Sequence, residues 1–158
     1  MESSTILNFI TKRNLSFACI PAYHMITLYS IYHRNKLMLP KEVGVYDNRE
    51  PRNTSQEALK KALGPDKYQR YVGASGAAQN GFEGFPIFAV MVLMGNHGNL
   101  NRSVLNLVAL SVVALRIYYT HVYITTRTTK TSFHRTMIWG VSTVIQVATM
   151  VVAAFKML

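Results

Sequence analysis

The sequence is poor in charged residues, and in acidic residues above all. Only 15% of its 158 residues are charged, whereas 49% are hydrophobic, a balance typical of membrane proteins rather than of soluble domains. Seven acidic residues stand against 17 lysines and arginines, which leaves a formal net charge of +10. The basic residues lie mostly between apolar runs and are not interleaved with aromatic residues. They therefore indicate membrane topology and not a nucleic-acid partner.

Cysteine pairs, metal-ligand clusters and repeats are also missing. The single cysteine, Cys19, lies in an apolar segment, so an intrachain disulfide is impossible. The five histidines have neither metal-ligand spacing nor a cysteine cluster beside them, and we expect no metal site. The absence of a long internal repeat argues against a transporter built from inverted repeats.

The sequence does contain four apolar stretches, each close to the roughly 20 residues that a spanning helix needs. We predict an all-α fold, an integral membrane four-helix bundle that forms a single domain over residues 1–158. The predicted transmembrane spans are 15–32, 73–94, 103–124 and 136–155, with a polar loop at 34–72. Within that loop, residues 55–63 have the pattern of a short helix, because Thr54 or Ser55 can cap it and a Gly-Pro pair ends it.

The segments that connect the predicted spans differ in their number of basic residues. Nine lysines and arginines lie in the first loop and three in the third connector, against four on the opposite side. The positive-inside rule then predicts that both connections lie on the cytoplasmic or matrix side, with the termini opposite. A site that opens on this side would have Arg34, Lys130 and Arg135 at its rim, which suits an anionic ligand.

The second and third spans carry polar side chains. Asn80 and Glu83 share one face of the second span, and Arg116, Tyr119 and Tyr123 form one stripe on the third. From the helical rise, Glu83 lies roughly 15 Å and Arg116 roughly 12 Å from the basic end of their spans. We therefore predict a buried ion pair between them. It either fixes helix packing only or lines a site that opens toward the basic side.

These residues resemble the MAPEG family, the membrane-associated proteins in eicosanoid and glutathione metabolism. The family's second helix has an Asn-x-x-Glu-x-x-Pro-x-Phe pattern, which reads here as Asn80, Glu83, Pro86 and Phe88. Its third and fourth helices have an Arg-x-x-Tyr pattern with a further Tyr and an opening basic residue, matched by Arg116, Tyr119, Tyr123 and Arg135. The YDNREPR and QNGFEGFPIF runs resemble the fungal-type branch, and the resemblance covers about residues 15–156.

The resemblance implies a trimer of four-helix bundles that binds glutathione between subunits, similar to the microsomal glutathione S-transferases. It implies that Arg135 stabilises the thiolate, with Arg135 and Tyr123 as the catalytic residues; Lys130 or Arg127 could take the role of Arg135. Many active members have an arginine four residues before the asparagine, where this chain has Gly76. The implied glutathione-binding residues are Asn80, Glu83, Arg116, Tyr119, Lys130 and Arg34.

We therefore predict a membrane-bound glutathione transferase or peroxidase that acts on lipophilic electrophiles or lipid hydroperoxides. Glutathione would be its co-substrate, membrane lipid and a lipophilic small molecule its further partners, and the endoplasmic reticulum or a mitochondrial membrane its location. The alternative is a non-catalytic subunit or scaffold with the same fold, within a larger assembly such as a mitochondrial respiratory complex. Glutathione binding separates the two hypotheses.

Overall fold

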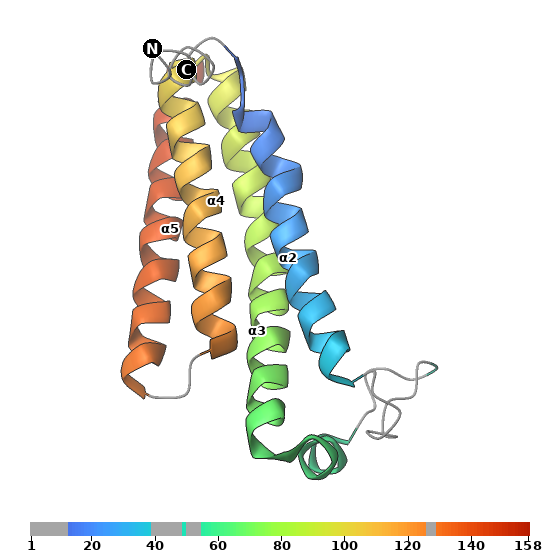
Figure 1. Cartoon of the computed structure of the whole chain (residues 1–158). Helices are drawn as coiled ribbons and strands as arrows, with labels where there is room; N and C mark the ends of the chain where they lie inside the picture. The colour runs from blue at the N-terminus through green and yellow to red at the C-terminus, as the bar shows by residue number, and fades with distance from the viewer. Residues whose placement is uncertain (1–12, 39–48, 50–54, 126–128) are drawn as a thin grey trace, which may run out of the picture.

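The protein folds as a bundle of four antiparallel helices (Figure 1). A computed structural model describes residues 13–38, 49, 55–125 and 129–158, and of residues 129–131 the backbone alone. The helices are α2 (Ser16–Met38), α3 (Gln56–His97), α4 (Arg102–Thr125) and α5 (Thr129–Met157). The predicted all-helical four-helix architecture is confirmed.

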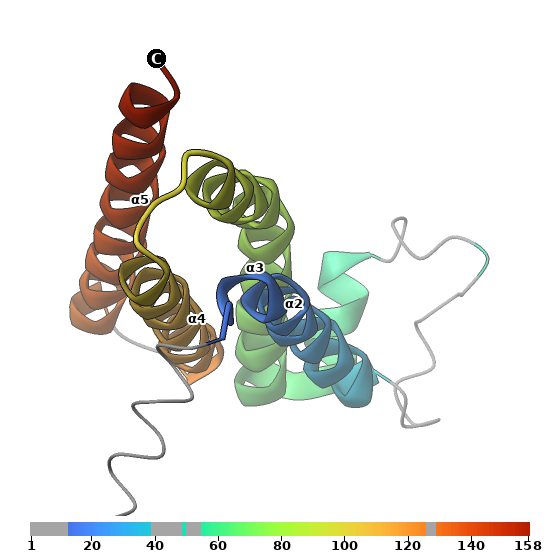
Figure 2. The ribbon, with the colours of Figure 1, turned by 90° about the horizontal axis from the view of Figure 1, so that it is seen from above.

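Helices α3 and α4 form the middle of the bundle. α2 packs against both of them on one side and α5 packs against both on the other, so that α2 and α5 lie apart when seen from above (Figure 2). The start of α2 and the end of α5 lie at one end of the bundle. The opposite end, where α2 and α4 finish and α3 and α5 begin, is the basic end.

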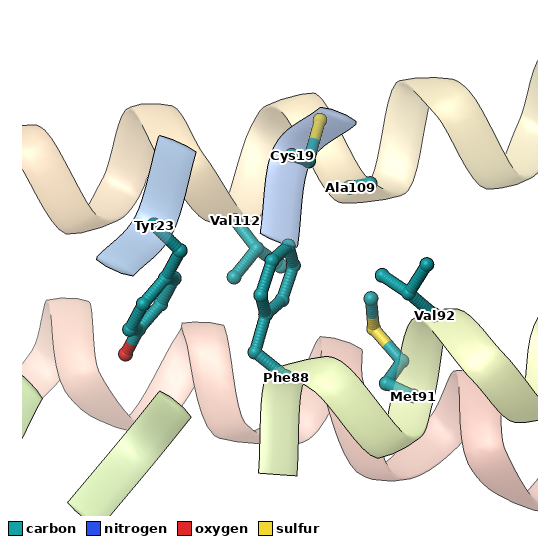
Figure 3. Packing of buried hydrophobic residues seen from close by; sticks show 7 residues of the cluster. All are labelled: Cys19, Tyr23, Phe88, Met91, Val92, Ala109 and Val112. Atoms are coloured by element: carbon teal, nitrogen blue, oxygen red, sulfur yellow. The ribbon is translucent and has the colours of Figure 1, made fainter. Parts of the chain in front are cut away.

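The hydrophobic core joins α2, α3 and α4. Its buried members are Cys19, Tyr23, Phe88, Met91, Val92, Ala109 and Val112 (Figure 3). The rings of Tyr23 and Phe88 stack with their centroids 4.9 Å apart. Small residues on α3 permit this close approach of the helices. A Cβ atom at Gly81, for example, would lie 2.5 Å from Oγ1 of Thr27 on α2.

Helix α3 is bent near its start. Ser55 caps it through a hydrogen bond of 3.3 Å from the backbone N–H of Ala58. Gly64 then takes a φ of 72°, which side-chain-bearing residues rarely adopt, and Pro65 starts the long segment that enters the bundle. The short helix predicted for residues 55–63 is thus confirmed. In the described part of the segment 34–72, α2 runs to Met38 and α3 begins at Gln56, so much of the predicted polar connection is helical.

A buried asparagine of α4 holds the start of α2. Oδ1 of Asn106 accepts hydrogen bonds of 2.9 Å from the backbone N–H groups of both Leu15 and Ser16. Its Nδ2 donates a bond of 2.7 Å to the carbonyl oxygen of Arg13. The first N–H groups of a helix have no partner within the helix, so Asn106 acts as a cap supplied from about 90 residues away in the sequence.

Two helical segments are long and apolar enough to cross a membrane by length and composition, Arg102–Thr125 and Ser132–Met157. Many of their outward-facing side chains are apolar, and Leu107, Val144 and Phe155 are each at least 65% exposed, which suits contact with lipid. In the described part of the chain α2 and α3 do not meet this criterion. Spans at 15–32 and 73–94 therefore stay predictions.

Candidate functional site

Arg116 lies inside the bundle, where α2, α3 and α4 meet. Only 6% of its surface is exposed. Its Nη2 atom donates a hydrogen bond of 2.5 Å to the carbonyl oxygen of Ala77. The guanidinium carbon lies 5.4 Å and 5.0 Å from the ring centroids of Tyr23 and Tyr119, and cation–π contacts of this kind are worth about 2 kcal/mol each when desolvated. The buried Nε atom has no hydrogen-bond partner among the described residues.

The predicted ion pair between Arg116 and Glu83 is wrong. Oε1 of Glu83 instead accepts a hydrogen bond of 3.0 Å from Nε2 of Gln79 on the same helix, and the Glu83 side chain is exposed in the single chain. Arg116 meets α3 at Gly81, where an added Cβ atom would lie 2.7 Å from Nη2. Glu83 is two residues further along and therefore about 200° around the helix. Equal depth along the bundle does not place the two residues on the same side of α3.

Both charged residues still line one small cavity between α3, α4 and α5, with a volume of about 160 Å³. Polar atoms on its walls also come from Asn80 and from Gln146 of α5. The Oε1 atom of Gln146 is buried and has no hydrogen-bond partner in the described part of the chain. Such a hollow suits water or the polar end of a ligand. It is smaller than the roughly 300–1,000 Å³ of typical ligand pockets.

A second polar cluster lies closer to the basic end. Nδ2 of Asn80 donates to the carbonyl oxygen of Gly76 at 2.9 Å and to the hydroxyl of Tyr123 at 3.4 Å. The guanidinium carbon of Arg135 lies 4.0 Å from the ring centroid of Tyr123. The rings of Tyr123 and Tyr119 meet edge to face, with centroids 5.3 Å apart. The structure thus brings Asn80, both tyrosines and Arg135 together from three helices.

A cleft of about 640 Å³ opens beside this cluster and extends along α3 toward the basic end. Its walls include Tyr123, Arg135 and Gln79. A recess of about 220 Å³ shares Tyr123 and Arg135 with the cleft and shares Asn80 and Trp139 with the small inner cavity. The cationic and phenolic groups therefore border a space large enough for a tripeptide-sized ligand.

Because Gly76 has no side chain, the Tyr123 ring can pack directly against α3. A Cβ atom at position 76 would lie 2.6 Å from Cε1 and 2.8 Å from the hydroxyl oxygen of Tyr123. Real Cβ atoms essentially never make such short contacts, so a larger side chain here requires the ring to move. The space beside position 76 is thus filled by the ring that Arg135 contacts.

Arg34 is not part of this cluster. Arg34 donates from Nε and Nη2 to Oδ1 of its neighbour Asn35, at 3.1 Å and 3.0 Å, and it lines none of the cavities described above. The side chains of Lys130 and Arg127 lie outside the described residues.

Sequence reasoning missed the contributions of α5 and α2 to the inner cavity. Nε2 of Gln146 donates to the carbonyl oxygen and to Oγ of Ser142, at 3.0 Å and 3.1 Å. A glutamine in the middle of an apolar span is costly, so the Gln146–Ser142 spacing was a signal that could have been used. Tyr23 and Trp139 gave no comparable signal, since aromatic residues are common in apolar helices.

Together, the fold and these clusters define a helical-bundle membrane protein whose polar side chains meet between helices toward one end. The sequence model of the MAPEG family matches residues 17–155, and the chain belongs to this family. Its members are membrane proteins that commonly form trimers and generally use glutathione. No curated protein and no solved structure matches the chain.

Proposed function

We propose that this chain is a glutathione transferase or peroxidase of the microsomal type, which acts on lipophilic electrophiles or lipid hydroperoxides at the endoplasmic reticulum or a mitochondrial membrane. The observation that carries the proposal is the contact of the Arg135 guanidinium with Tyr123, whose hydroxyl lies beside Asn80. In the described part of the chain, no carboxylate contacts Arg135. Its charge is therefore available to a ligand in the adjoining cleft.

This pair of groups suits thiolate chemistry. A thiol has an ordinary pKa of about 8.5 and is mostly protonated at neutral pH, but a nearby cation or hydrogen-bond donor favours the thiolate. The Tyr123 hydroxyl would donate to the sulfur and Arg135 would supply positive charge. The thiol proton passes to water. Sulfur then bonds to an electrophilic carbon as the leaving group departs with the bonding electrons. With a hydroperoxide, sulfur bonds to the outer oxygen as the O–O bond breaks, the alkoxide takes a proton from water, and a second glutathione thiol displaces water from the sulfenic acid to give the disulfide.

The remaining charges are complementary to the rest of glutathione, which has two carboxylates and one amine. Glu83 can accept from the ammonium group, since Gln79 is its only hydrogen-bond partner among the described residues. A ligand carboxylate that reaches the inner cavity would give the buried Nε of Arg116 the acceptor that it lacks. A tripeptide in the cleft would thus extend one end, with its ammonium group and a carboxylate, through the recess toward the inner cavity that both residues line.

We infer that the active form is a homotrimer. Glu83 is exposed in the single chain, and a carboxylate at bilayer depth costs several kcal/mol unless protein or water covers it. Phe82 and Ile87, its neighbours on α3, are also exposed apolar residues. A second copy packed on this face would cover all three. Arg34, which lies away from the site of its own chain, could then serve the site of a neighbouring copy.

The second candidate function is a non-catalytic membrane subunit or scaffold. The close contact of Gly76 with Tyr123 favours it, because no cation from α3 can enter the site at that position. The two candidates differ in one measurable property, which is whether glutathione binds.

The test is glutathione binding and thiolate formation by the purified oligomer in detergent, with the thiolate followed by its ultraviolet absorbance. Arg135→Gln should lower kcat by about 100-fold, comparable with the loss of one oxyanion-stabilising donor, and should leave the oligomer intact. Lys156→Gln, near the other end of α5, is the matched charge control. If the unmodified protein binds no glutathione at millimolar concentration, the scaffold function stands instead.

A further inference from the structure

A cavity of about 740 Å³ lies between α2 and α4, on a different face of α4 from Tyr119 and Tyr123. Its walls run from Met25 to His33 on α2 and from Ile117 to Thr125 on α4, and Arg70 of α3 closes the basic end. None of the candidate glutathione residues lines it. We call this cavity the α2/α4 groove.

The groove changes from apolar to basic along its length. Both helices run toward the basic end, and the eight steps of helical rise from Met25 to His33 correspond to a length of about 12 Å. Met25, Ile26 and Ile117 line the inner part, whereas His33 and Arg70 lie at the outer end. An apolar channel whose outer end has an arginine and a histidine matches an amphiphile with an anionic head.

In the described part of the chain, no acidic side chain lines the groove. The described acidic residues, Glu57, Asp66 and Glu83, do not line the groove. The Nδ1 atom of His33 is buried and has no hydrogen-bond partner among the described residues. His33 lies just beyond the predicted first span, and burial, Arg70 and Lys36 lower its pKa below the usual value. Tyr29 on the same helix and His121 on α4 also face the groove.

The groove also opens sideways. Met25 and Ile117 are 63% and 55% exposed, so an acyl chain can enter between the helices from the surrounding bilayer. The basic end lies on the cytoplasmic or matrix side by the positive-inside rule, and the cytoplasmic leaflet is the one enriched in anionic lipids. A soluble anion would satisfy the cations but would leave the apolar part of the groove unfilled.

We propose that the α2/α4 groove is a binding site for an anionic phospholipid. The phosphate accepts hydrogen bonds from Arg70, His33 and His121, and one acyl chain lies against Met25 and Ile117. The site is separate from the proposed glutathione site, so either can fail without the other.

The test is native mass spectrometry of the detergent-purified oligomer with phosphatidylglycerol or phosphatidylcholine of identical acyl chains. We expect phosphatidylglycerol to bind more tightly, and Arg70→Gln to weaken its binding about tenfold, as expected for one lost charge-assisted hydrogen bond. Lys67→Gln is the matched control: it removes the same charge from an exposed position three residues earlier on α3, outside the groove. Arg70→Lys, which keeps the charge, should retain most of the binding.

Three outcomes would overturn the proposal. Equal binding of the two phospholipids would show that the headgroup charge is not recognised. Equal weakening by Arg70→Gln and Lys67→Gln would show a general surface-charge effect. Displacement of the phospholipid by glycerol phosphate at equal concentration would show that the site takes a soluble anion. Thr120→Trp, which fills the groove, should lower the binding of both lipids if the acyl chain lies there.

Discussion

Replacing Gly76 with alanine tests the packing that holds Tyr123 against Arg135. The new Cβ atom would lie 2.6 Å from Cε1 and 2.8 Å from the hydroxyl oxygen of Tyr123. Overpacking of this kind costs about 1–3 kcal/mol. A ring that moves away gives up its cation–π contact with Arg135, worth about 1 kcal/mol, and a hydrogen bond from Asn80, also worth about 1 kcal/mol.

Alanine also brings a gain, because it favours the helix over glycine by about 1 kcal/mol. The losses do not simply add, since the ring relieves the clash by giving up the two contacts. We expect Gly76→Ala to lower the free energy of unfolding by about 1–3 kcal/mol, with a fall in the thermal midpoint of about 2–4 °C per kcal/mol. Thiolate formation should fall with it, because Tyr123 and Arg135 no longer lie together.

Gly140→Ala is the matched control for thermal unfolding in detergent. A Cβ atom at Gly140, inside α5, meets nothing within 4 Å, so this change should stabilise the protein by about 0.5–1 kcal/mol. In a Tyr123→Ala background the clash is gone, and Gly76→Ala should then stabilise by a similar amount. If Gly76→Ala stabilises the unmodified protein as much as Gly140→Ala does, the close packing of Tyr123 on α3 is refuted.

Three other perturbations have distinct expected results. Asn106→Leu leaves the part-buried N–H of Leu15 and the buried N–H of Ser16 without their acceptor and should cost about 2–4 kcal/mol of unfolding free energy. Thr149→Val, which loses only a bond within its own helix, should cost less than about 1 kcal/mol. A double-mutant cycle of Glu83→Gln and Arg116→Met should give a coupling free energy of unfolding below about 0.5 kcal/mol. A value above about 1 kcal/mol would show that the two side chains form an ion pair after all. Phosphatidylglycerol should bind more tightly as the pH falls from about 8 to about 6, because the phosphate raises the lowered pKa of His33 and binding takes up protons. His33→Gln should reduce that slope, and an unchanged slope contradicts the placement of the headgroup.

The number and order of the helices could be predicted because each depends on local sequence. Apolar runs of the right length predict α4 and α5, and the Gly64–Pro65 pair predicts the bend in α3. The sequence also places Asn80 and Tyr123 on consecutive spans toward the basic end, where the structure brings them into contact. Depth along a helix is fixed by the rise per residue alone.

Direction around a helix could not be predicted in the same way. Whether Arg116 reaches Glu83 depends on the rotation of α4 and on which helix fills the space opposite Gly81. Both are set by packing of the whole bundle. The contact of Asn106 with Ser16 likewise joins residues 90 positions apart, and nothing in either local sequence indicates the other partner. Contacts between residues so far apart in the sequence can be identified only once the packing of the whole bundle is known.

Glu83 and Arg116 do not pair with each other, and this arrangement suits a binding site better than the predicted ion pair would. A ligand with an ammonium group and carboxylates would have to break such a pair first, and separating buried partners costs about 3–5 kcal/mol. Here the guanidinium of Arg116 is held by rings and the Ala77 carbonyl, and Glu83 by Gln79. Neither charge neutralises the other, yet both border one cavity. Opposite charges held apart in this way are complementary to a zwitterionic peptide, which supports glutathione as the ligand.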